Sequence, residues 1–260
     1  MKDWTESLGP NLGQAVRWEA NGAALDPVGA VGRIFYSTDR IHKWEHYLPV
    51  YERTFARLCG SPGKFLEIGV AKGGSLEMWR RFFAPGTTIV GVDVDPACRE
   101  LKVGPDVHVR IGSQADEAFM RSVVAEFGPF DAIVDDGSHR TSHMVDTFKM
   151  LFERGLADGG TYLVEDVHSN YWPEFCDGPL TFVDFAKCLI DAMHAHYMDA
   201  IDGGELLFRV GHPRRLQSFS VPLVTTLIAA IEVHDSIVIV HRASRRRDLP
   251  RCIERDPQGA

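Results

Sequence analysis

The chain has 260 residues, a formal net charge of −8 at pH 7, and 45% hydrophobic residues. This length and composition suit one α/β domain with a normal core, and the negative charge argues against general binding to nucleic acid or anionic lipid. The five cysteines are scattered without a CxxC pair, so neither a disulfide framework nor a zinc knuckle is expected. The polar start and the lack of a long apolar run predict a cytoplasmic location without a membrane partner.

The N-terminal third of the chain contains one clear helical pattern. Residues 1–33 show no sustained periodicity and are expected to form an extended or loosely packed arm. Residues 43–58 carry apolar side chains at helical spacing, and Pro49 falls in the first turn, where a helix tolerates it. We therefore expect one helix before the sheet begins.

From residue 64, short apolar runs alternate with helical patterns. Runs rich in Val, Ile and Leu predict strands buried on both faces, and strand–helix alternation predicts a parallel, doubly wound sheet. Five strands are expected here, at KFLEIGV, TTIVGVDVD, VHVRIG, FDAIVDDG and GTYLVEDV.

The alternation stops at residues 173–215, which are interpreted as a helix or helix pair forming a lid or a subunit interface. The runs LIAAIEVHD and SIVIVHRA then predict two adjacent strands joined by a tight Asp-Ser turn, which brings the sheet to seven strands. The expected organisation is an N-terminal arm and helix over 1–60, an α/β domain over 61–243 and a polar tail over 244–260. The arginines at 245–247 are interpreted as part of this solvated tail.

The first expected strand runs into a glycine-rich turn, ExGxAxGGS, over residues 67–75. A ligand can approach the backbone closely there, and the start of the following helix offers unpaired N–H groups. The P-loop motif is absent, and Ala71 stands where the dinucleotide fingerprint needs its middle glycine. The string is closer to the methyltransferase pattern, and a carboxylate at Glu67 suits the amino group and sulfonium of S-adenosylmethionine better than a pyrophosphate. We predict cofactor contacts from Glu67, Gly69, Gly73 and Ser75.

Two further strand ends complete the predicted cofactor site. Asp93 ends the second strand, where a carboxylate can accept hydrogen bonds from the ribose hydroxyls of a nucleoside. Ser113 and Gln114 follow the third strand and are positioned to reach the adenine. Alternatively, Ser113 and Asp116 only cap the next helix, and the sequence does not separate these interpretations.

Acidic residues cluster at the ends of the fourth and fifth strands. The fourth ends Asp135-Asp136-Gly137-Ser138-His139, and the fifth ends Glu165-Asp166. Neighbouring strands lie about 5 Å apart, so these carboxylates should converge, and unpaired they would raise one another's pKa and destabilise the fold. A bound hard cation relieves that repulsion, and oxygen ligands favour Mg²⁺.

This cluster predicts a catalytic arrangement. Asp136, Glu165 and Asp166 would hold Mg²⁺, which would bind an acceptor oxygen and lower its pKa. His139, three residues after Asp136, is the predicted general base that removes the proton of the acceptor. His139 and His143 have i, i+4 spacing, but HExxH is absent, so His143 is expected to face the core or to cap its helix.

The motifs ExGxxxGGSxxMW, GxQxD, DDGSH and VED followed by YW resemble the magnesium-dependent sugar O-methyltransferases that modify macrolides and other glycosides, the mycinamicin and tylosin type. The resemblance covers about residues 64–172. It implies a class I methyltransferase, a Rossmann-like α/β fold with seven mostly parallel strands. It also implies metal ligands at Asp136, Glu165 and Asp166 and a base at His139. The family usually has Asp where Ser113 stands, and its larger members carry an extra N-terminal domain.

The acceptor is the least determined part of the prediction. Residues 36–51 and the pair Tyr171-Trp172 contribute aromatic and polar side chains that suit a sugar ring, although ordinary helix packing explains them equally well. The sequence predicts methylation of a saccharide or glycoside, and homo-oligomers are compatible with it. A catechol O-methyltransferase, an NAD-binding oxidoreductase and a non-catalytic cofactor-binding module are the alternatives.

Overall fold

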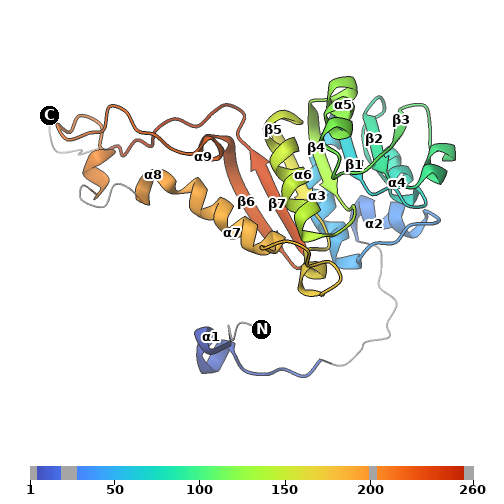
Figure 1. Cartoon of the computed structure of the whole chain (residues 1–260), viewed down its shortest axis with the longest axis horizontal. Helices are drawn as coiled ribbons and strands as arrows, with labels where there is room; N and C mark the ends of the chain where they lie inside the picture. The colour runs from blue at the N-terminus through green and yellow to red at the C-terminus, as the bar shows by residue number, and fades with distance from the viewer. Residues whose placement is uncertain (1–4, 19–27, 199–203, 255–260) are drawn as a thin grey trace.

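The computed structural model describes residues 5–18, 28–198 and 204–254, and within them the centre is a seven-stranded sheet of order β3-β2-β1-β4-β5-β7-β6 (Figure 1). The strands β1 to β5 are parallel, and β7 is antiparallel to both of its neighbours, β5 and β6. The prediction of a doubly wound, mostly parallel sheet of seven strands is confirmed. The strands are β1 Lys64–Ile68, β2 Thr88–Asp93, β3 Val107–Ile111, β4 Phe130–Asp135, β5 Leu156–Val164, β6 Ile228–His234 and β7 Ile237–Arg242.

Helices cover both faces of this sheet. One face packs against α2, α3 and α4, and the other against α5, α6 and α7. The α-helices are α1 Thr5–Leu12, α2 Gly29–Tyr36, α3 Leu48–Gly60, α4 Gly74–Phe82, α5 Glu117–Phe127, α6 Thr141–Arg154, α7 Phe182–Met193, α8 Ala195–Met198 and α9 Leu223–Leu227. The 3-10 helices are η1 Glu45–Tyr47, η2 Pro96–Glu100, η3 Val167–Tyr171 and η4 Gly204–Leu207. Within the described residues, no helix combines the length and apolar character needed to cross a bilayer.

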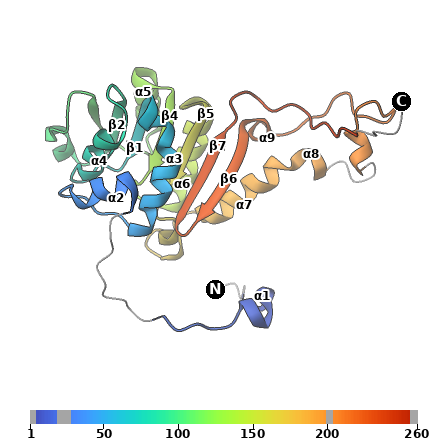
Figure 2. The same ribbon diagram turned by 180° about the vertical axis from the view of Figure 1, so that it is seen from behind.

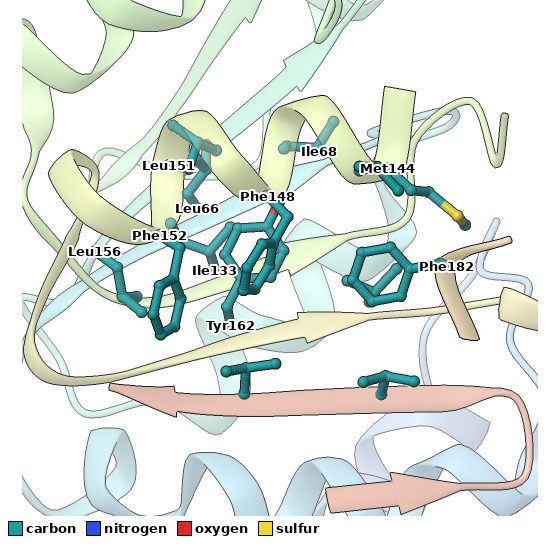
Figure 3. Packing of buried hydrophobic residues seen from close by; sticks show 14 of the residues in the cluster. Leu66, Ile68, Ile133, Met144, Phe148, Leu151, Phe152, Leu156, Tyr162 and Phe182 are labelled. Atoms are coloured by element: carbon teal, nitrogen blue, oxygen red, sulfur yellow. The ribbon is translucent and has the colours of Figure 1, made fainter. Parts of the chain in front are cut away.

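The core beside β4 and β5 holds the strand ends in place (Figure 3). Phe148 of α6 stacks on Phe152 with ring centroids 4.8 Å apart and meets Tyr162 of β5 edge to face at 5.0 Å. Leu66 and Ile133, from the neighbouring strands β1 and β4, are also fully buried in this cluster. Dense apolar packing under three adjacent strands fixes where their carboxyl ends lie relative to one another.

The expectation of a loose arm over residues 1–33 is partly wrong. Residues 29–36 form α2, in which Val31 is fully buried against the sheet domain. The carboxylate of Glu52 in α3 accepts hydrogen bonds from the backbone N–H groups of Ala30 and Val31, at 3.0 and 3.2 Å. Because a distant side chain satisfies the first turn of α2, its start carries no local capping signal. The short helix α1 lies apart from the sheet, and residues 1–4 and 19–27 fall outside the described part.

The C-terminal elements extend away from the sheet (Figure 2). The predicted helix pair in residues 173–215 corresponds to α7 and α8, and the predicted tight turn at Asp235-Ser236 joins β6 to β7. In the tail, Arg247 donates hydrogen bonds from its backbone N–H to Thr226 and from its guanidinium to Ile228. Cys252 forms an isolated β-bridge with Arg209. Residues 247–252 are therefore tied to the rest of this region.

Candidate active site

The turn after β1 is shaped for close approach of a ligand. Gly69 has φ +95°, and a Cβ at this position would lie 1.9 Å from the carbonyl oxygen of Asp136. Gly73 also adopts a left-handed conformation, with φ +79°, at the start of α4. These two positions require glycine, because a side chain would clash or strain the backbone.

Asp93, at the end of β2, holds this turn in its conformation through hydrogen bonds. Its Oδ2 accepts hydrogen bonds from the N–H groups of Val70 and Ala71, each at 2.8 Å, and its Oδ1 accepts one from Asp95 at 2.9 Å. Burial by itself raises the pKa of Asp93, but these backbone donors outweigh it and lower the pKa below its ordinary value. Asp93 is thus held as a carboxylate beside the glycine turn.

A cavity of about 480 Å³ lies over this turn. It is lined by the glycine turn, by residues 40–44, and by the ends of β4 and β5 with Asp136, His139, Glu165 and Asp166. A second cavity of about 300 Å³ is lined by Ser113, Gln114 and His143 and shares Gly69, Asp93 and Gly137 with the first. The two cavities follow the carboxyl edge of the parallel strands, where ligands bind in open α/β sheets.

Of the predicted adenine contacts, Ser113 and Gln114 both line the smaller cavity. The amide of Gln114 is already engaged: its Nε2 donates to Asp135 at 3.0 Å, and its Oε1 accepts from the N–H of Ser138 at 2.7 Å. The cap of α5 is Asp116, whose carboxylate accepts from the N–H of Phe119 at 3.1 Å. Gln114 therefore ties the β3 loop to the β4 loop.

Glu67 lies behind the larger cavity and is not one of the residues that line it. It is fully buried and accepts hydrogen bonds from Ser75 Oγ at 2.8 Å and Trp79 Nε1 at 3.1 Å. Burial raises the pKa of Glu67 to about 7, although Lys43 and these two donors act in the opposite direction. Glu67 braces the start of α4, and Ser75 does line the cavity.

The two acidic strand ends lie side by side, because β4 and β5 pair in parallel with Asp135 opposite Val164. Asp135 points into the core, where it accepts hydrogen bonds from Gln114 and Tyr162, and burial raises its pKa to about 7. His139 and Asp166 adopt left-handed backbone conformations, with φ +58° and +52°. These unusual conformations turn the chain at both strand ends and coincide with the residues predicted to be catalytic.

The carboxylates form two adjoining groups that share Asp136. In the first, which we name the inner cluster, the ammonium of Lys43 lies 2.5 Å from Asp136 Oδ2, 2.8 Å from Glu165 Oε2 and 3.8 Å from Glu67 Oε1. Lys43, Glu67 and Glu165 are nearly inaccessible to solvent. Burial and the neighbouring Asp136 raise the pKa of Glu165, whereas the contact with Lys43 lowers it.

The second group, the outer cluster, consists of Asp136, His139 and Asp166. Each offers one ligand atom, and these atoms all lie within 4.8 Å of one another. His139 Nε2 is 3.8 Å from both Asp136 Oδ1 and Asp166 Oδ2. The hydroxyl of Tyr47 donates to Asp166 Oδ1 at 2.6 Å, which holds that carboxylate at the cavity wall.

The donor set fits a divalent cation. Glu165 Oε1 is buried, and although Tyr51 lies close by, neither that oxygen nor the Tyr51 hydroxyl has a partner with hydrogen-bond geometry among the described residues. Asp136 and Glu165 both contact Lys43, and Asp166 directly follows Glu165, so oxygen ligands of the kind that Mg²⁺ prefers gather at this edge. Of the three predicted ligands, Asp136 and Asp166 lie together with His139, whereas Glu165 is outside that group and meets Asp136 on the side of Lys43.

Sequence reasoning missed the residues that reach this site from outside the strand ends. Lys43 and Tyr47 come from the segment before α3, and their only sequence signal was the concentration of polar and aromatic residues in 36–51. His143 lines the smaller cavity and is hydrogen-bonded through Nδ1 to Ser138 Oγ at 2.7 Å, whereas we expected it to face the core or cap its helix.

The strand order and the two cavities at the carboxyl edge define a class I methyltransferase fold. No protein-family model matches the chain. It is 39% identical over 165 residues to the 8-demethyl-8-alpha-L-rhamnosyl tetracenomycin-C 2'-O-methyltransferase of Streptomyces olivaceus, a match covering 58% of this chain and 43% of that protein. It is 36% identical over 190 residues to the corresponding 3'-O-methyltransferase of the same organism, covering 66% and 47%. The chain thus spans less than half the length of these curated relatives.

The solved structures agree with these relatives. The MycE methyltransferase of the mycinamycin biosynthetic pathway, in complex with Mg, S-adenosylhomocysteine (SAH) and mycinamycin VI, superposes with a TM-score of 0.68 at 26% identity. The match covers 90% of this chain and 57% of that protein. The chain is therefore a relative of the sugar O-methyltransferases of mycinamicin and tetracenomycin type, and the resemblance recognised in its motifs is confirmed.

Proposed function

We propose that the chain is an S-adenosylmethionine-dependent, magnesium-assisted O-methyltransferase that acts on a sugar hydroxyl of a glycoside or oligosaccharide. One observation carries this proposal: the outer cluster and the glycine turn line the same cavity. A hydroxyl held at the outer cluster would lie beside a cofactor held at the turn. The names of the relatives, which methylate rhamnosyl and other glycosyl groups, support the choice of a sugar.

The cofactor would extend across both cavities. Its adenosine end suits the smaller cavity, with Ser113 and Gln114, and its methionine end suits the glycine turn with Gly69, Gly73 and Ser75. Asp93 lies where the cavities meet and can accept hydrogen bonds from ribose hydroxyls. Since Glu67 is buried behind Ser75, we assign it to bracing the turn and thereby to the cofactor site indirectly.

Asp136, Glu165 and Asp166 would hold the magnesium ion, which, when bound, supplies a Lewis acid that lowers the pKa of the acceptor hydroxyl. His139 lines the cavity, with its Nε2 3.8 Å from both Asp136 and Asp166, and would take the proton of that hydroxyl. The remaining task of the protein is alignment of oxygen, methyl carbon and sulfur for in-line displacement.

The acceptor would enter past an aromatic rim. The rings of Trp44 and His168 meet edge to face at 5.7 Å, and those of His168 and Trp172 at 5.0 Å. Trp44 and Trp172 are about half exposed, so their faces and edges are available to a sugar ring or to the group attached to it. The rim lies next to Asp166, since His168 Nδ1 is 4.0 Å from Asp166 Oδ1.

The direct test is transfer of labelled methyl from S-adenosylmethionine to panels of glycosides and simple catechols, with Mg²⁺ and with EDTA. Methylation of sugar hydroxyls that EDTA abolishes is expected. Methylation of catechols alone would favour the alternative in which a vicinal phenolic diol occupies the outer cluster. Activity that survives EDTA would remove the metal from the proposal.

A thermal-shift comparison tests the oxidoreductase alternative. S-adenosylmethionine should raise the melting temperature, whereas NADH should not, and the reverse result would indicate an oxidoreductase. A cytoplasmic location and a homo-oligomer remain predictions. Size-exclusion chromatography with light scattering would measure the subunit count, with the α7–α8 region as the proposed contact.

A further inference from the structure

Lys43 is the one cation found within the inner cluster among the described residues. It comes from the loop between α2 and η1, outside the sheet domain, and its side chain is 4% exposed. Its ammonium approaches Asp136 and Glu165 at hydrogen-bond distance and lies 5.9 Å from the centroid of the Tyr51 ring. A lysine buried this completely against two predicted metal ligands calls for an electrostatic explanation.

Lys43 engages only one oxygen of each carboxylate. It contacts Oδ2 of Asp136 and Oε2 of Glu165. The other oxygens are left over: Asp136 Oδ1 faces His139 in the outer cluster, and Glu165 Oε1 is buried near Tyr51 without a hydrogen bond of standard geometry among the described residues. The same two carboxylates can therefore serve Lys43 on one side and a second cation on the other.

The negative charge of the surrounding carboxylates explains why Lys43 can be buried at this position. Three carboxylates within 4 Å of one point would repel one another strongly without a cation. The buried ammonium of Lys43 contacts Asp136 and Glu165 and lies 3.8 Å from Glu67, so it supplies the positive charge that offsets these carboxylates.

We propose that Lys43 is a positioning residue: a built-in counter-ion that keeps the metal-free site assembled and, by sharing Asp136 and Glu165, sets how tightly the divalent ion binds. This inference rests on the proposed function for the presence of that ion. Two cations that share ligands repel each other, so Lys43 makes the divalent ion bind more weakly and exchange more readily than the carboxylates alone would.

The test uses Lys43→Met, which keeps the length of the side chain without its charge. Mn²⁺ serves as the probe, and its binding is measured by the electron paramagnetic resonance signal of free Mn²⁺. We expect Lys43→Met to bind Mn²⁺ roughly tenfold more tightly than the wild type. Without metal its melting temperature should fall by roughly 10 °C, because a buried pair loses one partner. The matched control, Lys149→Met, removes an exposed lysine paired with Asp146 and should change neither value.

A merely structural role would give the opposite sign, since damaged ligand geometry can only weaken the binding of Mn²⁺. Wild-type or weaker affinity in Lys43→Met would therefore overturn the inference. A wild type that binds no Mn²⁺ would overturn the metal in the proposed function itself, so the two failures are distinct.

A second variant covers the case in which Lys43→Met does not fold without metal. Lys43→Met/Glu165→Gln removes one anion together with the cation and should recover most of the lost melting temperature in EDTA. Absence of any recovery would contradict the counter-ion role.

Discussion

The inner and outer clusters contain the same kind of side chain but balance their charge differently. In the inner cluster, Lys43 and Glu165 are 4% and 1% exposed and form an ion pair within the protein. In the outer cluster, His139 and Asp166 are 24% and 23% exposed and face a cavity. Asp136 belongs to both clusters, and Glu165 of the inner cluster is followed directly by Asp166 of the outer one.

A buried carboxylate has to be neutralised by the protein itself, whereas a carboxylate that faces a cavity can be neutralised by a ligand. A fully buried carboxylate without a cation costs several kcal/mol, so a counter-ion has to be part of the chain. A carboxylate beside a cavity keeps part of its hydration and can exchange water for a metal or substrate. We therefore assign stability mainly to the inner cluster and chemistry mainly to the outer one.

The largest effect is expected at the shared residue. Asp136→Asn keeps the shape of the side chain but removes the negative charge that the two clusters share. We expect methyl transfer to fall by roughly three orders of magnitude or more, because metal binding and acceptor orientation both depend on it. Radiolabelled turnover measures this, with the exposed Asp146→Asn as control. Activity within tenfold of the wild type would show that Asp136 is not a metal ligand.

His139→Ala distinguishes a base from a ligand in the outer cluster. Turnover should fall by roughly 10²–10⁴-fold, the usual contribution of a general base, while Mn²⁺ affinity stays within about threefold. The exposed His194→Ala provides the comparison. Loss of Mn²⁺ binding in His139→Ala would instead make the imidazole the third metal ligand, as the spacing of the three outer side chains permits.

Glu67 makes the stability of the inner cluster depend on pH. Its pKa is raised by burial from 4.5 to about 7, so its contribution to the unfolding free energy is complete below pH 4.5 and is lost as the pH rises through 7. Glu67→Gln can still form hydrogen bonds with Ser75 and Trp79. The free energy of unfolding of this variant, relative to that of the wild type, should rise by roughly 2–3 kcal/mol from pH 5 to pH 8. Urea unfolding of metal-free protein measures this, and a difference that does not grow with pH would contradict the burial effect.

The smallest effect is expected at Tyr47, which supports the outer cluster from outside. Tyr47→Phe removes the hydrogen bond to Asp166 and should lower turnover by roughly fivefold, equivalent to about 1 kcal/mol. Tyr36→Phe, which removes an exposed hydroxyl paired with Glu45, should leave turnover unchanged. Equal turnover in the two variants would mean that Asp166 needs no support from Tyr47.

Local sequence pattern was sufficient for the sheet and for the residues at its carboxyl edge. Continuous apolar runs marked the strands, and a parallel arrangement brings the residues at or just past their ends to one edge. These residues are Gly69, Asp93, Asp136, His139 and Asp166. Which side chains follow a strand is decided within a few residues of the chain, so it can be seen in the sequence. The motifs therefore indicated the class of chemistry before the fold was known.

Only the tertiary structure decided which carboxylates face inward and which face the cavity. Adjacent residues such as Asp135 and Asp136 point in different directions, and a sequence pattern of two aspartates cannot show which one is buried. Likewise, Lys43 is 93 residues from Asp136 along the chain, and Glu52 satisfies the start of α2 from another helix. Contacts over such separations arise from how the N-terminal segment packs on the sheet, and the local sequence does not show which partners each side chain meets there.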